Sequence, residues 1–186
     1  MKLQEAIASR RSIKVYKSNP VSHETIRTLL EIAVIAPNHR MTQPWRFYVM
    51  GQESRAAFGK VLGHRKAKKI DDKEAAKIVI EKVTNTHRSL PTMIAVATEL
   101  NDNPEIREED YAASYMGIQN LCLTACSMGL GTHVKTGAVM DDPIARKAIG
   151  VREGERVIAT ISLGEPAEIP ESKPRKTAES LTIWNP

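Results

Sequence analysis

Apolar residues recur at helical spacing in several stretches, and short runs that are apolar throughout stand between them. The spacing i, i+3, i+4, i+7 predicts a helix that begins after Ser22, a candidate N-cap, and ends before Pro37. A short helix is predicted over 2–10 on the same grounds. Weaker helical patterns cover 53–62, 74–89 and 143–150. Charged side chains dominate 63–73, and the pattern between residues 60 and 75 does not define the element boundaries.

Four short apolar runs predict β-strands. The run over 46–50 is closed by Gly51, and the run over 92–98 has the continuous apolar character of a central strand. Further strands are predicted over 132–136 and 156–163. The strands lack the short, regular spacing of βαβ units, so the pattern favours an α+β fold over a doubly wound parallel sheet.

The longest predicted helix, over 108–128, is unusual because apolar or small residues occur almost all the way round it. Such a helix must be buried on more than one side. The layers of one small domain usually cover only one side. The sequence therefore predicts that a partner chain covers the other face.

Composition narrows the class of protein. A chain of 186 residues fits one domain, 1–186, with a proline-punctuated tail over 164–186. Its 41% hydrophobic and 26% charged residues exclude collagen-like and disordered classes. The net charge of +5 suits small anions as well as nucleic acid. Because the chain starts without the apolar core of a signal peptide and has no run long enough to span a membrane, we expect a cytoplasmic location without a membrane partner.

Two basic clusters far apart in sequence are candidates for binding one anion. Arg10, Arg11, Ser12 and Lys14 stand where the first helix ends, and Lys173-Pro174-Arg175 follows the last strand. Charge-assisted hydrogen bonds from such groups suit a phosphate. The Arg10-Arg11-Ser12 cluster alone is more typical of a solvated basic turn, and the second cluster is what favours a shared anion.

Several common catalytic signatures are missing. Gly129-Leu130-Gly131 follows a helix instead of opening one, which disfavours a dinucleotide fingerprint, and no P-loop, serine-hydrolase elbow or zinc-protease helix is present. Cys122 and Cys126 are interpreted as reduced core thiols, since their helix has no further metal ligand at suitable spacing. No metal site and no nucleophile are predicted.

Two histidines and one basic run stay open. His39, in a loop between prolines, and His133 could each contact a ligand, bind a metal or act as a base. The run over 60–69 could form a nucleic-acid or membrane patch. It has no interleaved aromatic residues, which favours a solvated helix or a mobile flap.

Five segments together resemble the flavin-dependent nitroreductase family, and within it a short branch. The resemblance extends over nearly the whole chain, and the order and spacing of the segments make it specific. The matching segments are Arg10-Arg11-Ser12, the stretch from Ala36-Pro37-Asn38-His39 to Gln43-Pro44-Trp45-Arg46-Phe47, the stretch from Gly129 to Ala138, Leu163-Gly164-Glu165-Pro166, and Lys173-Pro174-Arg175.

The resemblance implies an α+β homodimer with a central, mostly antiparallel sheet flanked by helices and a long central helix at the dimer interface. It also implies two FMN sites at that interface, NADPH or NADH as reductant, and a tail over 164–186 that wraps the partner. The residues expected to contact FMN are Arg10, Arg11, Ser12, Lys14, Pro37, Asn38, His39, Gln43, Val134, Lys135, Thr136, Gly137, Lys173 and Arg175.

The implied activity is hydride transfer by a ping-pong mechanism from NAD(P)H to a nitroaromatic, a quinone or a similar conjugated acceptor. No side chain is expected to be catalytic, because the flavin carries the chemistry and the backbone N–H of Gly137 addresses its N5 atom. Ile35 and Val134 depart from the residues of the short branch, which bears on acceptor and cofactor binding. The alternatives are a related flavin reaction, such as dehalogenation or flavin fragmentation, and a basic homodimeric nucleic-acid-binding module without flavin. The leading interpretation has no nucleic-acid partner.

Overall fold

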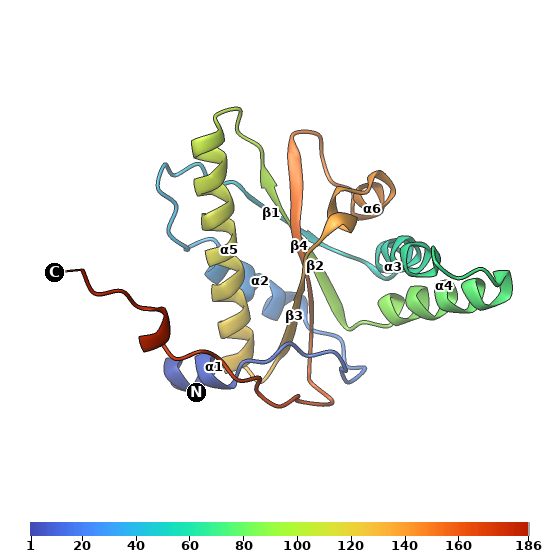
Figure 1. Ribbon diagram of the computed structural model, residues 1–186, viewed down its shortest axis with the longest axis horizontal. Helices are drawn as coiled ribbons and strands as arrows, with labels where there is room; N and C mark the ends of the chain where they lie inside the picture. The colour runs from blue at the N-terminus through green and yellow to red at the C-terminus, as the bar shows by residue number, and fades with distance from the viewer. Residues whose placement is uncertain (186) are drawn as a thin grey trace.

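The computed structural model, which describes residues 1–185, has one four-stranded sheet with helices on both faces (Figure 1). The strand order is β1-β2-β4-β3, and every neighbouring pair is antiparallel, as an α+β fold with an antiparallel sheet requires. The strands are β1 (Trp45–Val49), β2 (Thr92–Glu99), β3 (Gly131–Lys135) and β4 (Glu155–Gly164). The helices are α1 (Leu3–Ser9), α2 (His23–Ala33), α3 (Gln52–Ala67), α4 (Lys73–Arg88), α5 (Pro104–Ser127) and α6 (Pro143–Ile149), with short 3-10 turns η1 (Ala138–Asp141) and η2 (Glu179–Leu181).

Two hydrophobic cores, one on each face, hold the sheet between the helices. Against α2 and α5 the core includes Leu29, Leu121 and Ile161. Against α3 and α6 it includes Phe58 and Met93. Since β2 is covered on both faces, its run of apolar residues needs no alternation with polar ones, which explains why the sequence predicted it well.

Helix α5 begins earlier than predicted, at Pro104 rather than at Glu108. The Asn103 side chain caps the helix by accepting a hydrogen bond from the Glu105 N–H (2.9 Å), and Pro104 occupies the first turn. The sequence interpretation took this stretch as a polar connection, because its charged residues hid the helix start. The Ser22 cap of α2 is confirmed by a hydrogen bond from the Thr25 N–H (3.1 Å).

The segment between residues 60 and 75 forms the end of α3, a turn and the start of α4. Asp72 begins α4 by accepting hydrogen bonds from the N–H groups of Glu74 (2.8 Å) and Ala75 (3.0 Å). The two helices approach so closely that a Cβ on Gly63 would lie 2.8 Å from the Ile80 Cα. Glycine is therefore required there, which periodicity of apolar residues alone does not reveal.

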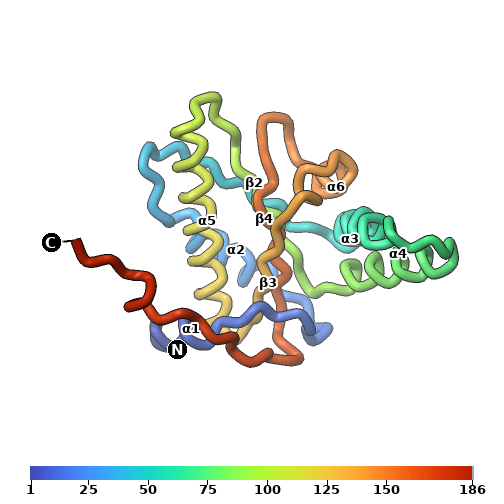
Figure 2. The backbone as a smooth tube through the Cα atoms, in the orientation of Figure 1, coloured from blue at the N-terminus to red at the C-terminus, as the bar shows by residue number. Residues whose placement is uncertain are grey.

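The segment that follows α1 pairs with the edge strand β3 and so ties this open edge of the sheet to α1. Ser12 forms a parallel bridge with Thr132 of β3, and the Ile13 N–H donates to the Thr132 carbonyl (2.9 Å). The tail begins beside Tyr16, which bridges to Pro166. From there the tail runs past α1 and projects away from the sheet (Figure 2), exposed along its whole length from Ala167. Within the described residues, no helix combines the length and apolar character needed to cross a membrane.

Candidate active site at the open edge of the sheet

Arg10 and Arg11 lie at the end of α1, beside the first residues of β3. With Thr132 and Cys126 they line a small cavity of about 180 Å³. The Arg11 guanidinium donates to the carbonyls of Ala8 (2.6 Å) and Arg10 (2.9 Å), so the end of α1 holds it in place. Arg10 takes part in no ion pair within residues 1–185. This end of β3 therefore offers two cations to an anion.

A row of basic groups continues along β3. Burial lowers the pKa of the Lys135 ammonium, and the nearby charge of Lys66 lowers it further. Burial likewise lowers the pKa of His133, with smaller effects from Lys135 and Lys14. None of the three lysines has an ion-pair partner within the described chain. This edge of the sheet therefore carries basic side chains that form no ion pair within the described residues.

Strand alternation separates two of the predicted flavin contacts. The Val134 side chain packs against the core under α2 and α5, whereas its neighbours point to the opposite face. On the face away from α2 and α5, Lys135 pairs with Thr160 of β4, and His133 pairs with Ser162. Only the backbone of Val134 can therefore share a binding surface with the Lys135 side chain.

Among the described residues, four buried side-chain atoms lack a hydrogen-bond partner: the Thr160 and Ser162 hydroxyls, Nε2 of His87 and Nε of Arg55. The Arg55 side chain still donates through its other nitrogens, whereas His87, which is 5% exposed, keeps an unpaired ring nitrogen. The His87 Nδ1–H donates to the Val83 carbonyl (2.8 Å), which leaves Nε2 as a bare acceptor. Buried polar groups normally have partners. Sequence reasoning missed Thr160, Ser162 and His87. The two hydroxyls lie within the apolar pattern of β4, and His87 lies in a polar stretch at the end of α4, where nothing marks it as buried.

Gly137 lies just after β3 and has a backbone conformation that glycine adopts easily. Its φ is 114°, and a Cβ added there would meet no atom within 4 Å. The Gly137 carbonyl accepts from the Met140 N–H (3.0 Å). Beside it is a groove of about 400 Å³, whose lining includes Tyr111, Tyr115 and Arg156. Open space on a bare backbone allows a flat molecule to approach closely.

The loop over 37–44, which carries four predicted contacts, lies on the other side of α5 from β3 (Figure 1). The Asn38 side chain points into the loop, where its carbonyl accepts from the Gln43 N–H (2.7 Å). Thr42 donates to the buried Asp110 carboxylate on α5. Gln43 has a φ of 48°, a conformation that is costly for any residue with a side chain. The loop is therefore held in a defined shape.

His39 is an exposed residue of this loop and contacts α5. It forms a hydrogen bond with Glu109 on α5 (2.9 Å). His39 and Arg40 together lower the pKa of the Glu109 carboxyl. Pro37 is exposed. Within one chain, the segment from Arg10 to Lys14 lies beside β3, which leads to Gly137, whereas the 37–44 loop lies across α5 (Figure 1). The tail runs past α1 (Figure 2), and its residue Ile169 lines the cavity beside Arg10 and Arg11.

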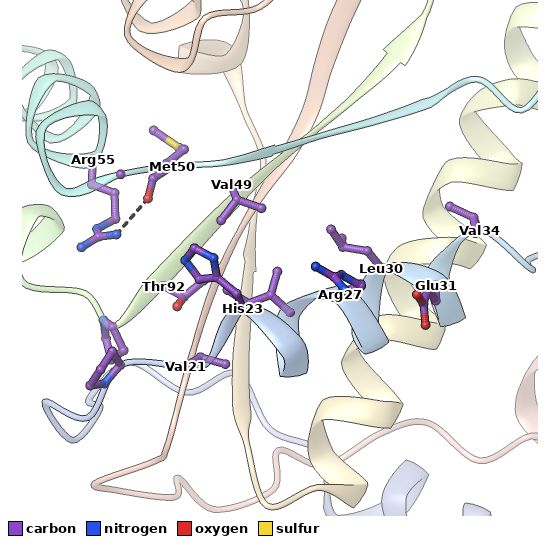
Figure 3. Close-up of a pocket in the computed structure, with 14 residues that line it drawn as sticks. Val21, His23, Arg27, Leu30, Glu31, Val34, Val49, Met50, Arg55 and Thr92 are labelled. Carbon is purple, nitrogen blue, oxygen red and sulfur yellow. Dashed lines mark hydrogen bonds between the residues drawn. The ribbon is translucent and has the colours of Figure 1, made fainter.

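A larger groove, of about 800 Å³, lies between α2 and the junction of β1 with α3 (Figure 3). Its lining is mostly apolar and includes Val21, Leu30 and Val49. The Arg55 side chain at its end donates to the Met50 carbonyl (2.8 Å). None of the predicted site residues lines it, so size alone does not mark the candidate site.

Comparison with known proteins identifies the family. The family model described as the nitroreductase family matches residues 7–165. The chain belongs to the nitroreductase family. A relative from Bacillus subtilis (strain 168), named "Putative NAD(P)H nitroreductase YfhC", is 36% identical over 174 residues, covering 93% of this chain and 89% of the relative.

Solved structures of nitroreductases share the fold. A nitroreductase-like family protein from Bacillus cereus superposes with a TM-score of 0.84 at 24% identity, covering 100% of this chain and 96% of that one. The FMN and NADPH-dependent nitroreductase NfnB from Sphigopyxis sp. strain HMH gives a TM-score of 0.78 at 19% identity, covering 100% of both chains. The nitroreductase-like α+β fold is therefore confirmed.

The burial of His87 predicts how stability changes with pH in this nitroreductase. Burial lowers the pKa of His87 in the folded state, with smaller effects from Lys135 and Lys66. Below pH ~6.5 the unfolded chain therefore takes up a proton that the folded chain resists, and stability falls by up to about 1.4 kcal/mol per pH unit. We expect His87→Phe to flatten the dependence of the unfolding free energy on pH between about 7.5 and 5.5, as measured by urea titration.

The matched control is His64→Gln, at an exposed position on the neighbouring helix α3. It is expected to keep the pH dependence of the unmodified protein. Equal slopes for the His87→Phe variant and the unmodified protein would contradict the role assigned to His87.

Proposed function

We propose that this nitroreductase-family protein is an FMN-dependent oxidoreductase that transfers hydride from NAD(P)H to a nitroaromatic, quinone or similar conjugated acceptor by a ping-pong mechanism. The observation that carries the proposal is the unbalanced positive edge along β3, from Arg10 to Lys135, which ends at the open backbone of Gly137. Relatives named as NAD(P)H nitroreductases and a structural neighbour titled as FMN and NADPH-dependent support the same cofactor and reductant.

The residues along this edge fit FMN. Arg10, Arg11 and Ser12 would hold the phosphate at the first residues of β3, and Arg175 and Lys173 would complete its cage from the tail. Lys14 and Lys135 place positive charge where the electron-rich pyrimidine edge of the ring would lie. The orphaned hydroxyls of Thr160 and Ser162 offer hydrogen bonds on the face that Lys135 shares.

When bound, FMN would supply hydride acceptance and donation, so the protein needs no nucleophile. The chain would position the ring: the backbone from Val134 to Gly137 would line its face and edge, and the Gly137 N–H would point at N5. Pro37, Asn38, His39 and Gln43 would approach the flavin from the second subunit, since the 37–44 loop lies across α5 from β3. Asn38 would act by holding the shape of the loop, because its side chain caps Gln43.

The visible absorption spectrum tests the cofactor and reaction together. We expect the purified protein to be yellow, or to become yellow and stay so after incubation with FMN and desalting. Anaerobic NADPH should bleach it, and a nitroaromatic or a quinone added after removal of NADP⁺ should restore the colour. A protein that remains colourless after incubation with FMN would refute the proposal.

The phosphate site is tested by the double substitution Arg10→Ala with Arg175→Ala. Each charge-assisted hydrogen bond contributes about 1.5 to 3 kcal/mol, so FMN affinity should fall at least about 100-fold. Quenching of FMN fluorescence measures the affinity, and circular dichroism checks the fold. Arg152→Ala, an exposed arginine away from the site, is the control. Full FMN content in the double variant would show that the phosphate lies elsewhere.

We propose further that the protein is a homodimer in which α5 meets its counterpart and the tail wraps the partner. The exposed face of α5 carries Tyr115 (43% exposed) and Met116 (41%). Near the end of the tail, Ile183 (85%) and Trp184 (88%) project into solvent. Large apolar side chains so exposed are typical of surfaces that another chain covers.

Removal of the tail tests this assembly. A chain that ends at Lys176 keeps the phosphate-site residues but loses Ile183 and Trp184, so its dimer should dissociate at lower dilution than that of the full chain. Light scattering across a dilution series measures the change, and Glu179→Ala in the full-length tail is the control. A full-length monomer would contradict the dimer, and a truncated chain with unchanged dissociation would contradict the role of the tail.

A further inference from the structure

Turn η1 begins where the chain leaves the sheet, and the hydrophobic core fixes its middle. β3 ends at Lys135, and the chain then passes through Gly137 into η1. The side chains of Val139 and Met140 are buried in the core against α3 and α6. The Met140 N–H also donates to the Gly137 carbonyl (3.0 Å). The last residue of the turn, Asp141, lies outside the core and needs another anchor.

That anchor is an ion pair between Asp141 and Arg156 of β4. Nε of Arg156 lies 3.1 Å from one carboxylate oxygen of Asp141, and Nη2 lies 3.4 Å from the other. A guanidinium that binds both oxygens fixes the orientation of the carboxylate as well as its distance. Arg156 is held in place because its backbone pairs with Thr98 of β2 and its guanidinium lies 5.8 Å from the centre of the Tyr111 ring. The pair therefore ties η1 to the sheet and to α5.

The exposure of this ion pair shows that it adds little to the stability of the fold. The Arg156 side chain is 48% exposed and that of Asp141 is 55% exposed. Ion pairs so open to water contribute little to the free energy of unfolding. Loss of the pair should therefore leave the fold intact and release only the outer side of the turn.

The direction of the Gly137 N–H depends on the position of η1. This N–H donates to no backbone carbonyl within residues 1–185, and Gly137 is exposed, so the donor is available to a ligand. Glycine has no side chain that could anchor it, and its backbone is permissive. Gly137, Asp141 and Arg156 line one groove of about 400 Å³. The ion pair thus restrains the segment that aims the free donor.

We propose that the ion pair between Asp141 and Arg156 positions the Gly137 N–H toward N5 of the flavin and thereby sets the rate of hydride transfer to that atom. This inference rests on the proposed function. Hydride transfer breaks the C4–H bond of the nicotinamide, forms a bond to N5 and moves two electrons onto the ring, which leaves NADP⁺. A donor aimed in advance at the atom where charge develops lowers the barrier. Asp141 and Arg156 are positioning residues, since they act through Gly137.

Stopped-flow measurement of FMN bleaching by NADPH tests the proposal on the FMN-loaded protein. We expect Asp141→Ala and Arg156→Gln each to slow bleaching at saturating NADPH about 10-fold, the loss of one well-aimed hydrogen bond. The affinities for FMN and NADPH should change less than about 2-fold, because the interaction is made during hydride transfer. Since the two side chains act as one pair, the double variant should be no slower than either single variant.

Two further variants separate orientation from charge and from the loss of any ion pair. Arg156→Lys keeps the positive charge but cannot bind both carboxylate oxygens in the same way, so bleaching should remain slow. Glu53→Gln breaks an exposed ion pair with Arg88 at another place on the surface. It is the matched control and should keep the bleaching rate of the unmodified protein.

The Gly137 amide adds a readout that does not depend on turnover. In NMR spectra of glycine-labelled protein, bound FMN should protect this amide from exchange with water, and Asp141→Ala should reduce the protection about 10-fold. Unchanged protection in the Asp141→Ala variant, a full bleaching rate in the Arg156→Lys variant, or a loss of FMN affinity as large as the loss of rate would overturn the proposal. An unmodified protein that binds no FMN, or that NADPH does not bleach, would instead refute the proposed function.

Discussion

Basic side chains that form no ion pair within the described residues are the constraint that shapes the open edge of this sheet. The charges of Lys135 and Lys14 lower the pKa of His133, and the charge of Lys66 lowers that of Lys135. None of these lysines has an ion-pair partner within the described residues. Holding like charges together costs free energy in a partly buried place. A fold keeps such an arrangement only if its backbone is fixed by other interactions, and here those interactions are found on both sides of β3.

On one side, the N-terminal segment pairs with β3 through Ser12 and Thr132, which sets Arg10 and Arg11 against the strand. On the other side, β4 is buried along almost its whole length and fixes the register that places Thr160 opposite Lys135. Because β4 is an inner strand, its polar side chains cannot turn to water. The orphaned hydroxyls and Lys135 are therefore brought to one face by the same ladder of hydrogen bonds.

The sequence predicted the parts of this arrangement that depend on local pattern. The apolar run of β2, the Ser22 cap and the basic cluster after α1 could all be recognised because each signal lies within a few residues. The close packing of α3 on α4 could not, since the glycine at position 63 matters only in contact with Ile80.

The 37–44 loop adds a second constraint, because holding its backbone in the observed conformation costs free energy. Gln43 adopts a left-handed backbone conformation, and the loop keeps it through Asn38 and through Thr42, which is bonded to the buried Asp110. Strain of this kind persists only where surrounding contacts hold it, and it is common at binding sites. In one chain the loop lies across α5 from β3. If the strained loop and the cationic edge serve one cofactor, each site needs both subunits, so assembly and FMN binding would stabilise each other.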